Sequence, residues 1–197
     1  MNDNMMINQV APDWVSTFSG GIFHPLEPRV EEVVIEDIAQ ALSNTCRYNG
    51  HVREFYSVAQ HSVLVAENTP DPYKLHALLH DASEAYIADI TRPIKHRFYI
   101  SRPWTGNDID VFADRDFQSY KRIEERLMKV IFEALGVTET NYELVHLHDN
   151  RALETEMRDL MSRTFGYQEP YPEEIIPWTP SAARDRFLKL YRTLRGE

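Results

Sequence analysis

The sequence has little cysteine and no long hydrophobic run. Its single cysteine, Cys46, cannot form a disulfide within one chain, and such sparse use fits a reducing cytosol. No apolar run approaches the roughly 20 residues of a membrane-spanning helix. The first residues, MNDNMMINQVAPDW, carry neither a basic segment nor a long apolar run, so we expect no signal peptide. These absences argue against a disulfide-stabilised secreted domain, and we expect a cytoplasmic protein that makes no membrane contact.

Positive charge is also scarce. The chain has 21 Lys and Arg against 31 Asp and Glu, which gives a formal net charge of −10. An acidic surface repels the phosphate backbone of DNA and RNA, so we expect no nucleic-acid partner. A small phosphorylated ligand can still bind where the sign of the charge is reversed locally.

The 197 residues, of which 43% are hydrophobic, suit one compact domain. Apolar residues recur at helical spacing and strands do not alternate with helices, so we expect an all-α helical bundle. Residues 13–35, rich in Gly and Pro, predict a short irregular segment or β-hairpin. Ser57 is a candidate N-cap, with Gln60 as its capping-box partner. Helices are predicted over about 36–46, from Ser57, from Asp71-Pro72 to about 89, over 120–135, over 141–165 and over about 179–195.

The most informative stretch, residues 75–95, reads LHALLHDASEAYIADITRPIK. His80, Asp81 and Glu84 fall at i, i+1 and i+4. A continuous helix would therefore place His80 and Glu84 on one face, with Asp81 about 100° away. Imidazoles and carboxylates are costly to bury among Leu and Ala. Taken alone, however, the His-Asp pair is more typical of a solvated helix edge with one hydrogen-bonded histidine.

Two further residues favour a metal site. His61 lies on the apolar stripe of its predicted helix, and Asp149 has apolar neighbours at i−4, i+3 and i+4 that place it on the buried side. Two imidazole nitrogens and two carboxylate oxygens suit Mn²⁺, Fe²⁺, Co²⁺, Ni²⁺ or Zn²⁺, and less well Mg²⁺. On a six-coordinate ion they leave two positions for water and substrate. The competing ligand candidates, for which we expect surface exposure, are His146 and His148.

Such a centre can polarise a phosphoryl oxygen and help to generate hydroxide, with Glu84 and Asp89 available for proton transfer or water positioning. The local charge fits a phosphate. Residues 90–107 contain no Asp or Glu, although each basic residue there is by itself more typical of surface charge. Arg47 adds positive charge before His61. The basic residues of the segment are Arg92, Lys95, Arg97 and Arg102.

The pattern of His61, His80-Asp81 and Asp149 resembles the HD-domain metal-dependent phosphohydrolases. The motifs SVAQHS, LLHDASEAYIADITRPIK and HDNRALETE resemble the 5′-deoxynucleotidase branch, as does Arg47-Tyr48, where that branch has Arg followed by an aromatic residue. The likeness covers about residues 36–165, and the whole chain is similar to small phage and bacterial HD hydrolases. Residues 97–118 form a longer insertion than the branch has, which we interpret as a lid, a partner interface or a surface insertion.

The resemblance implies a single all-α HD domain over residues 1–197, with its core at about 36–165 and a C-terminal packing helix at about 179–195. It implies one divalent metal ion and a homo-oligomer, dimeric or larger. The implied metal ligands are His61, His80, Asp81 and Asp149. The implied catalytic carboxylates are Glu84 and Asp89. The implied substrate contacts are Arg47 and Tyr48 for the sugar or base, and Thr91, Arg92 and Lys95 for phosphate.

The expected function is hydrolytic removal of phosphate from 5′-(deoxy)nucleotides by metal-activated water. One alternative is a dATP or dNTP triphosphohydrolase that releases triphosphate, since those enzymes share the Arg-aromatic and HD motifs. The other is a non-catalytic nucleotide-binding HD module, which the presence of Glu84 and Asp89 disfavours. Gly50 offers no side chain to exclude the amino group of guanine, so the base preference stays open.

Overall fold

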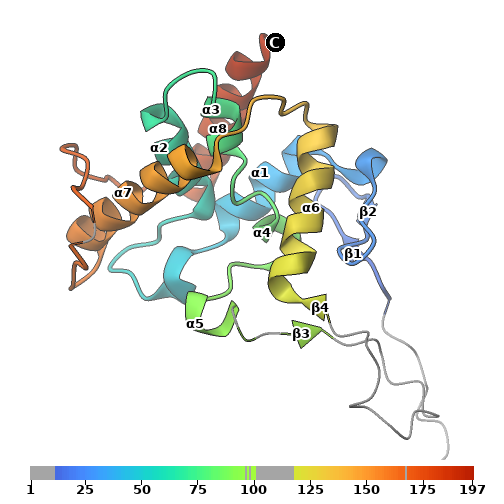
Figure 1. The fold of residues 1–197 in the computed structure, drawn as a ribbon, viewed down its shortest axis with the longest axis horizontal. Coiled ribbons are helices and arrows are strands. Elements are labelled where there is room, and N and C mark those ends of the chain that lie inside the picture. Colours follow the sequence, from blue (N-terminus) through green and yellow to red (C-terminus); the bar gives the residue numbers. More distant parts are fainter. Residues whose placement is uncertain (1–11, 96, 98, 101–117, 167) are drawn as a thin grey trace, which may run out of the picture.

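The computed structural model describes residues 12–95, 97, 99–100, 118–166 and 168–197 (Figure 1). These residues are mostly helical and include two small antiparallel sheets. The all-α prediction with a short N-terminal hairpin agrees with this arrangement. Most of the insertion predicted at 97–118 lies outside the described residues, including Arg102.

The hairpin pairs β1 (Val15–Ser16) with β2 (Ile22–Phe23), so that Val15 lies opposite Phe23. Asp37 fastens its turn, because the backbone N–H of Ser19 donates to Oδ1 at 2.6 Å and the Ser19 hydroxyl donates to Oδ2 at 2.9 Å. A short 3₁₀ turn, η1 (Val30–Glu32), then leads into the helical body.

The long helices are α1 (Ile35–Asn44), α2 (Val58–Asn68), α6 (Tyr120–Ala134), α7 (Tyr142–Leu160) and α8 (Pro180–Arg195), and the short ones include α3 (Lys74–Leu78) and α4 (Glu84–Ile87). The core lies among α1, α2, α3 and α8, which pack on one another, while α2 also contacts α7. In Figure 1, α6 stands beside the hairpin, α7 extends toward the opposite side, and α4 lies between them. None of the helices described here is long and apolar enough to cross a membrane.

Two of the predicted helices are shorter than expected. The first ends at Asn44 rather than at 46, because Cys46 pairs with Ser57 in an isolated bridge and Val58 N–H donates to the Thr45 carbonyl. The helix predicted to reach 165 ends at Leu160, where the following residue is extended. The final helix and the helix that starts at Tyr120 are confirmed, and Gly136 follows the latter with φ +67°.

The cap of α2 is confirmed, but its capping box is not. Ser57 accepts the backbone N–H of Gln60, as predicted. The Gln60 side chain does not turn back to Ser57. Instead it donates to the Ile176 carbonyl at 2.9 Å and accepts the Trp178 N–H at 2.8 Å. It therefore fastens the segment before α8 to α2.

The predicted helix from Pro72 to about 89 is broken into two pieces. Helix α3 (Lys74–Leu78) begins two residues later than expected, and α4 (Glu84–Ile87) follows after turns at 79–83. Backbone bonds here run to the third residue back, as from Ala82 to Leu79, which is the tighter 3₁₀ pattern. His80 and Asp81 therefore lie in a tight turn, and the expectation that His80 and Glu84 share one regular helix face is wrong.

The segment after α4 is short and irregular. Ala88, with φ +66°, ends α4, and α5 (Arg92–Lys95) follows. Strands β3 (Tyr99–Ile100) and β4 (Gln118–Ser119) then pair antiparallel and lead into α6.

Candidate metal centre

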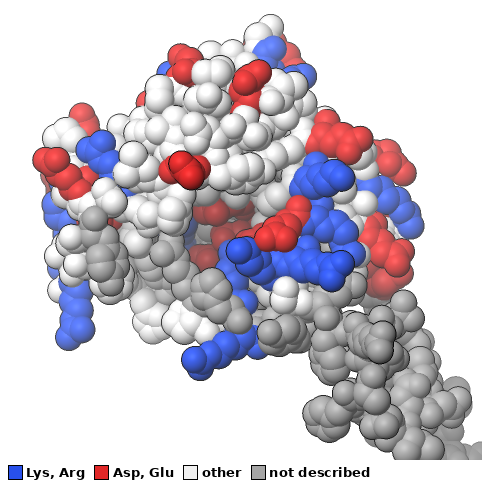
Figure 2. All heavy atoms as spheres, in the orientation of Figure 1, with Lys and Arg blue, Asp and Glu red and all other residues white. Residues whose placement is uncertain are grey.

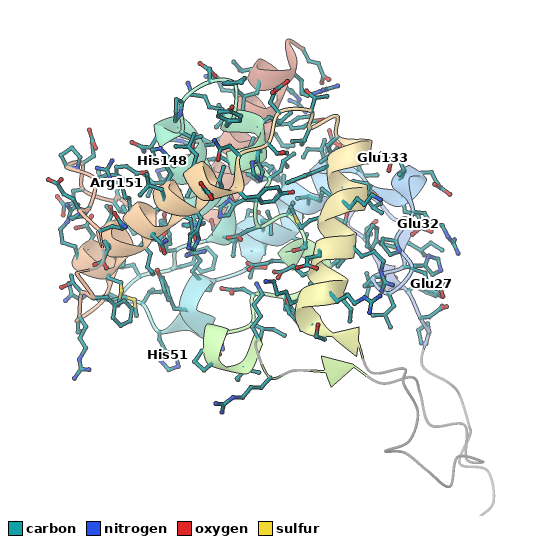
Figure 3. All side chains as sticks on the ribbon, in the orientation of Figure 1. Glu27, Glu32, His51, Glu133, His148 and Arg151 are labelled. Carbon is teal, nitrogen blue, oxygen red and sulfur yellow. The ribbon has the colours of Figure 1, made fainter. Side chains whose placement is uncertain are left out.

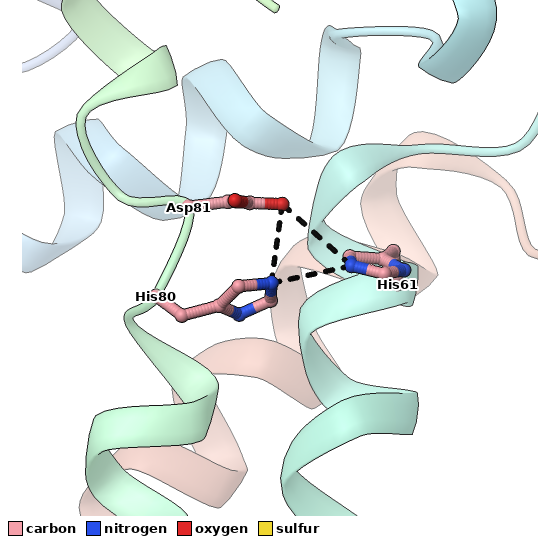
Figure 4. A group of neighbouring side chains, drawn as sticks. All are labelled: His61, His80 and Asp81. Carbon is pink, nitrogen blue, oxygen red and sulfur yellow. Dashed lines mark hydrogen bonds and ion pairs between the residues drawn. The ribbon is translucent and has the colours of Figure 1, made fainter. Parts of the chain in front are cut away.

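Three predicted ligands converge on one point. His61 comes from α2, whereas His80 and Asp81 come from the turn between α3 and α4 (Figure 4). The two Nε2 atoms are 3.3 Å apart, and the Asp81 Oδ2 atom lies 3.6 Å from His61 Nε2 and 3.3 Å from His80 Nε2. Their ligand atoms all lie within 4.8 Å of one another, so the triad is a possible metal site.

The other ring nitrogens fix the orientation of both imidazoles. His80 Nδ1 donates to the Ala77 carbonyl at 2.7 Å, within its own turn. His61 Nδ1 donates at 2.6 Å to Oε1 of Glu156, which is fully buried on α7. Each Nε2 atom is thereby aimed at the centre, as is usual for histidines that bind metals.

Asp149 reaches the same point from α7. Its Oδ1 atom lies 3.2 Å from His61 Nε2, and its side chain is 17% exposed. Burial raises the pKa of Asp149, but the hydrogen bond from His61 and the charges of His80 and Arg47 hold it well below its usual range. The fourth predicted ligand therefore lies beside the triad.

The two alternative ligand candidates, His146 and His148, differ in their exposure to solvent. His146 is exposed, with Nδ1 3.9 Å from Oδ2 of Asp149. His148 is half-buried, contrary to prediction, and its Nδ1 atom lies 2.8 Å from the Tyr171 hydroxyl. The segment after α7 folds back over the helix, and Arg151 stacks on Tyr171 at 4.5 Å; His148 and Arg151 are labelled on α7 in Figure 3.

Glu84 is buried at 6% exposure, and its Oε2 atom has no hydrogen-bond partner among the described residues. Burial, followed by the charges of Asp81 and Asp89, raises the pKa of Glu84 well above its usual value. Burial also raises the pKa of Asp89, against the opposing charge of Arg47. Both predicted catalytic carboxyls therefore have a raised proton affinity.

Arg47 and Tyr48, in the turn η2 (Arg47–Gly50), face Glu156. Arg47 Nε donates to Oε2 of Glu156 at 3.1 Å, and Arg47 Nη1 lies 3.5 Å from Asp81 Oδ2. The Tyr48 hydroxyl donates to the same Glu156 oxygen. The polar groups predicted to contact the sugar or base thus already have partners in the protein, and the substrate contact stays a prediction.

Glu156 is the residue that the sequence analysis missed. Burial alone would raise its pKa, but Arg47 and His61 lower it to about 2, so it is an anion. A signal was available in the HDNRALETE motif, since Glu156 follows Asp149 by seven residues. That spacing puts both carboxylates on one face of α7.

The predicted phosphate contacts are less uniform. Lys95 is mostly buried and forms an ion pair with Glu124 of α6, so its positive charge is partly neutralised within the protein. Burial lowers the pKa of Lys95, but Glu124, together with the charges of Glu84 and Asp81, raises it above its usual value. Thr91 is half-buried, and its carbonyl accepts the first backbone bonds of α5. The side chain of Arg92 lies outside the described residues.

Comparison with known proteins gives two relatives, while no family model matches. The Escherichia coli K12 protein YfdR is 39% identical over 147 residues, which are 75% of this chain and 72% of YfdR. The chain belongs to the YfdR family. A Rhodobacter capsulatus protein, RCAP_rcc00048, is 37% identical over 91 residues, or 42% of this chain and 46% of that protein. Neither name states an activity, so membership of the YfdR family assigns no chemistry.

The donor set of this YfdR-family chain fits a divalent cation. His61 Nε2 faces His80 Nε2, Asp81 Oδ2 and Asp149 Oδ1, and all of these atoms carry lone pairs. Only a positive charge stabilises such an arrangement. It can be a proton, because Glu156 and Asp149 raise the pKa of His61 to about 9 against the effects of burial and Arg47. It can equally be a metal ion, to which a mixed N/O set is suited.

A cleft opens from the centre of the YfdR-family chain toward α6. Its main part, of 720 Å³, begins at His80 and runs along α6 to Val137 and Tyr142. A recess of 190 Å³ adjoins it and reaches Asp149. Figure 2 shows a hollow between α7 and α6, with acidic atoms in its depth and Lys and Arg gathered over the lower part of α6.

Proposed function

We propose that this protein is a metal-dependent phosphohydrolase that acts on 5′-(deoxy)nucleotides. The observation that carries the proposal is the convergence of His61, His80 and Asp81, with both histidine Nδ1 atoms engaged elsewhere. Asp149 lies beside them, and the resemblance of these motifs to HD-domain hydrolases supports the same conclusion. A divalent ion held there would supply Lewis-acid polarisation of a phosphoryl oxygen and would make water more acidic.

The chain itself supplies the groups that move protons. Glu84 is a buried carboxyl with raised proton affinity, next to the charges of Asp81 and Asp89. Hydrolysis of a phosphomonoester takes a proton from the attacking water and returns one to the leaving oxygen. Two neighbouring carboxyls of unequal proton affinity can serve both ends of that transfer, which contributes roughly 10²–10⁴-fold to a rate.

The local charge favours a single phosphoryl group over a triphosphate. Lys95 shares its charge with Glu124, and Arg47 is engaged by Glu156 and Asp81. These two positive charges are then less available to a chain of three phosphates. A triphosphohydrolase is therefore the second candidate function. It would use the same mechanism but would release triphosphate instead of orthophosphate.

The test is a nucleotide panel on the metal-stripped protein. We expect EDTA to abolish hydrolysis, and Mn²⁺ or Co²⁺ to restore release of orthophosphate from nucleoside 5′-monophosphates. Chromatography of the products would reveal triphosphate if the second candidate function holds. Activity that survives stripping, or no turnover of any nucleotide with any of the ions, would refute the proposal. Binding without turnover would identify a non-catalytic module instead.

Two variants separate the roles in that assay. Glu84→Gln keeps the size of the side chain but cannot ionise, so we expect turnover to fall roughly 10²–10⁴-fold while metal binding is retained. Asp81→Asn removes a ligand, and we expect it to lose the metal as well as the activity. Normal turnover by Glu84→Gln would remove this residue from the mechanism.

A further inference from the structure

The proposed chemistry leaves the cleft along α6, next to the candidate metal centre, without a role. Its 720 Å³ falls within the roughly 300–1,000 Å³ that small-molecule sites usually occupy. The main cleft and the recess share part of their lining, so they adjoin each other beside the candidate metal centre. The shared lining residues are His80, Met128, Phe132 and Tyr142.

The lining changes character along the cleft. His80 and Asp149 supply the polar groups at the metal end, whereas other parts of the lining are apolar or aromatic, as at Met128 and Phe132 of α6 and at Val137 after it. Charged residues also border the space, three acidic against one basic. This excess of acid disfavours a chain of phosphates along the cleft and favours an uncharged group there. The charged residues are Glu124, Glu125, Lys129 and Glu133.

One wall of the cleft carries an aromatic cluster with one exposed ring. His76 is buried and meets the rings of Phe132 at 5.3 Å and Tyr142 at 4.7 Å, in both cases edge to face. Asn141 N–H donates to His76 Nδ1 at 3.1 Å, which fixes the imidazole against Tyr142. Tyr142 itself is 68% exposed at the first position of α7. A planar ligand can therefore stack on a supported ring.

We propose that this cleft binds the nucleobase of the substrate, stacked near Tyr142, while its phosphoryl end lies at His61, His80 and Asp81. The inference rests on the proposed function, because it takes the ligand to be a 5′-nucleotide. It assigns the base to α6 and the start of α7 rather than to Arg47 and Tyr48, whose polar groups are bound to Glu156.

The test compares variants in a binding assay that needs no catalysis. Deoxyadenosine, deoxyguanosine, deoxycytidine and thymidine, which lack phosphate, are titrated into the EDTA-treated full-length protein. Aromatic stacking on a base predicts that Tyr142→Ala weakens nucleoside binding about tenfold. Tyr142→Phe keeps the ring and should bind like the wild type. Leu147→Ala, an exposed residue of the same helix outside the cleft, is the matched control and should also be unchanged.

A second variant fills the space without altering Tyr142. Met128 lines both parts of the cleft, so Met128→Trp should weaken nucleoside binding as well. For the hydrolysis reaction, both variants should lower kcat/KM for nucleotides by a larger factor than kcat/KM for 2-deoxyribose 5-phosphate, which has no base.

The outcomes separate the two proposals. If no nucleoside binds, or if Tyr142→Ala binds all four as well as the wild type does, the base site is refuted even if nucleotides are hydrolysed. If nucleosides bind through Tyr142 and no nucleotide is hydrolysed, the base site stands and the phosphohydrolase proposal fails.

Discussion

Glu156 links the metal centre to the turn that carries Arg47 and Tyr48. It accepts hydrogen bonds from Arg47, Tyr48 and His61, and it is fully buried. A carboxylate that accepts from the non-ligating nitrogen of a ligand histidine orients that histidine, and its loss typically costs 10–100-fold in metal affinity. Glu156 is therefore a positioning residue for the centre.

Replacing Glu156 by Gln tests this role. The amide cannot balance the buried charge of Arg47 or hold His61 as firmly, so we expect metal affinity to fall about 10–100-fold in calorimetric titrations. Glu154→Gln is the matched control, because Glu154 is buried on the same helix and its Oε2 accepts the Gly166 N–H instead. Equal losses of affinity in the two variants would show that Glu156 acts only through stability.

His76 makes the stability of the fold depend on pH. Burial, with a smaller effect of the His80 charge, lowers the pKa of His76 from 6.5 to about 4. Below about pH 6.5 the unfolded chain binds a proton at this position that the folded chain does not. The stabilisation from the neutral imidazole is therefore complete above pH 6.5 and is lost as the pH falls toward 4.

The variant His76→Asn isolates that contribution. Its amide oxygen can still accept the Asn141 N–H, but it does not titrate. We expect the free energy of unfolding of the wild type, measured by urea titration, to fall relative to that of the variant between pH 6.5 and 4. A difference that stays constant over this range would contradict the assignment.

At the scale of elements, the structure shows which helices and turns are determined by local sequence patterns and which are not. The hairpin, the Ser57 cap and the end of α6 before Gly136 follow from local chemistry, and the sequence predicted them. The break between α3 and α4 did not follow, since Leu, Ala and Glu favour a continuous helix. There the packing and the 3₁₀ bonds override propensity, and they turn His80 and Asp81 toward α2.

The candidate site was predicted only in part, because local sequence patterns reveal some of its residues but not the contacts between distant segments. The four ligand candidates could be chosen because an imidazole or carboxylate within an apolar pattern needs a partner. The engagement of Arg47 with Glu156 joins residues far apart in the sequence, so no local pattern could reveal it. The pairing of Lys95 with Glu124 likewise depends on how α5 lies against α6.

Gln60 offers a test of how α8 is attached. Its amide is bound at both ends by backbone groups of Ile176 and Trp178. Gln60→Ala leaves these groups without their partner, so we expect thermal or urea unfolding to show a loss of about 1–3 kcal/mol. Gln40→Ala removes a side-chain bond to Arg184 and should cost less than about 1 kcal/mol. A cost as small for Gln60 would mean that its two bonds contribute little to holding the segment before α8.

At the scale of the whole molecule, the proposed ion binding would be coupled to folding. The candidate ligands come from α2, the α3–α4 turn and α7, so the unfolded chain has no assembled site. Added Mn²⁺ or Co²⁺ should therefore raise the melting temperature. At an ion concentration of 100 times the dissociation constant, the expected stabilisation of the folded state is about 2.7 kcal/mol. Differential scanning fluorimetry measures this, with Asp81→Asn as the control. An equal rise in that variant would locate the ion elsewhere.

The order in which the ligand-bearing elements are made by the ribosome has a consequence. His61, His80 and Asp81 are synthesised well before Asp149 and Glu156, which arrive together on α7. A nascent chain that has not yet docked α7 leaves His61 without the carboxylate that steers its ring. Translation should thus pass through a stage in which His61, His80 and Asp81 are present but bind ions poorly, and tight cation binding should follow only after α7 has been made and docked.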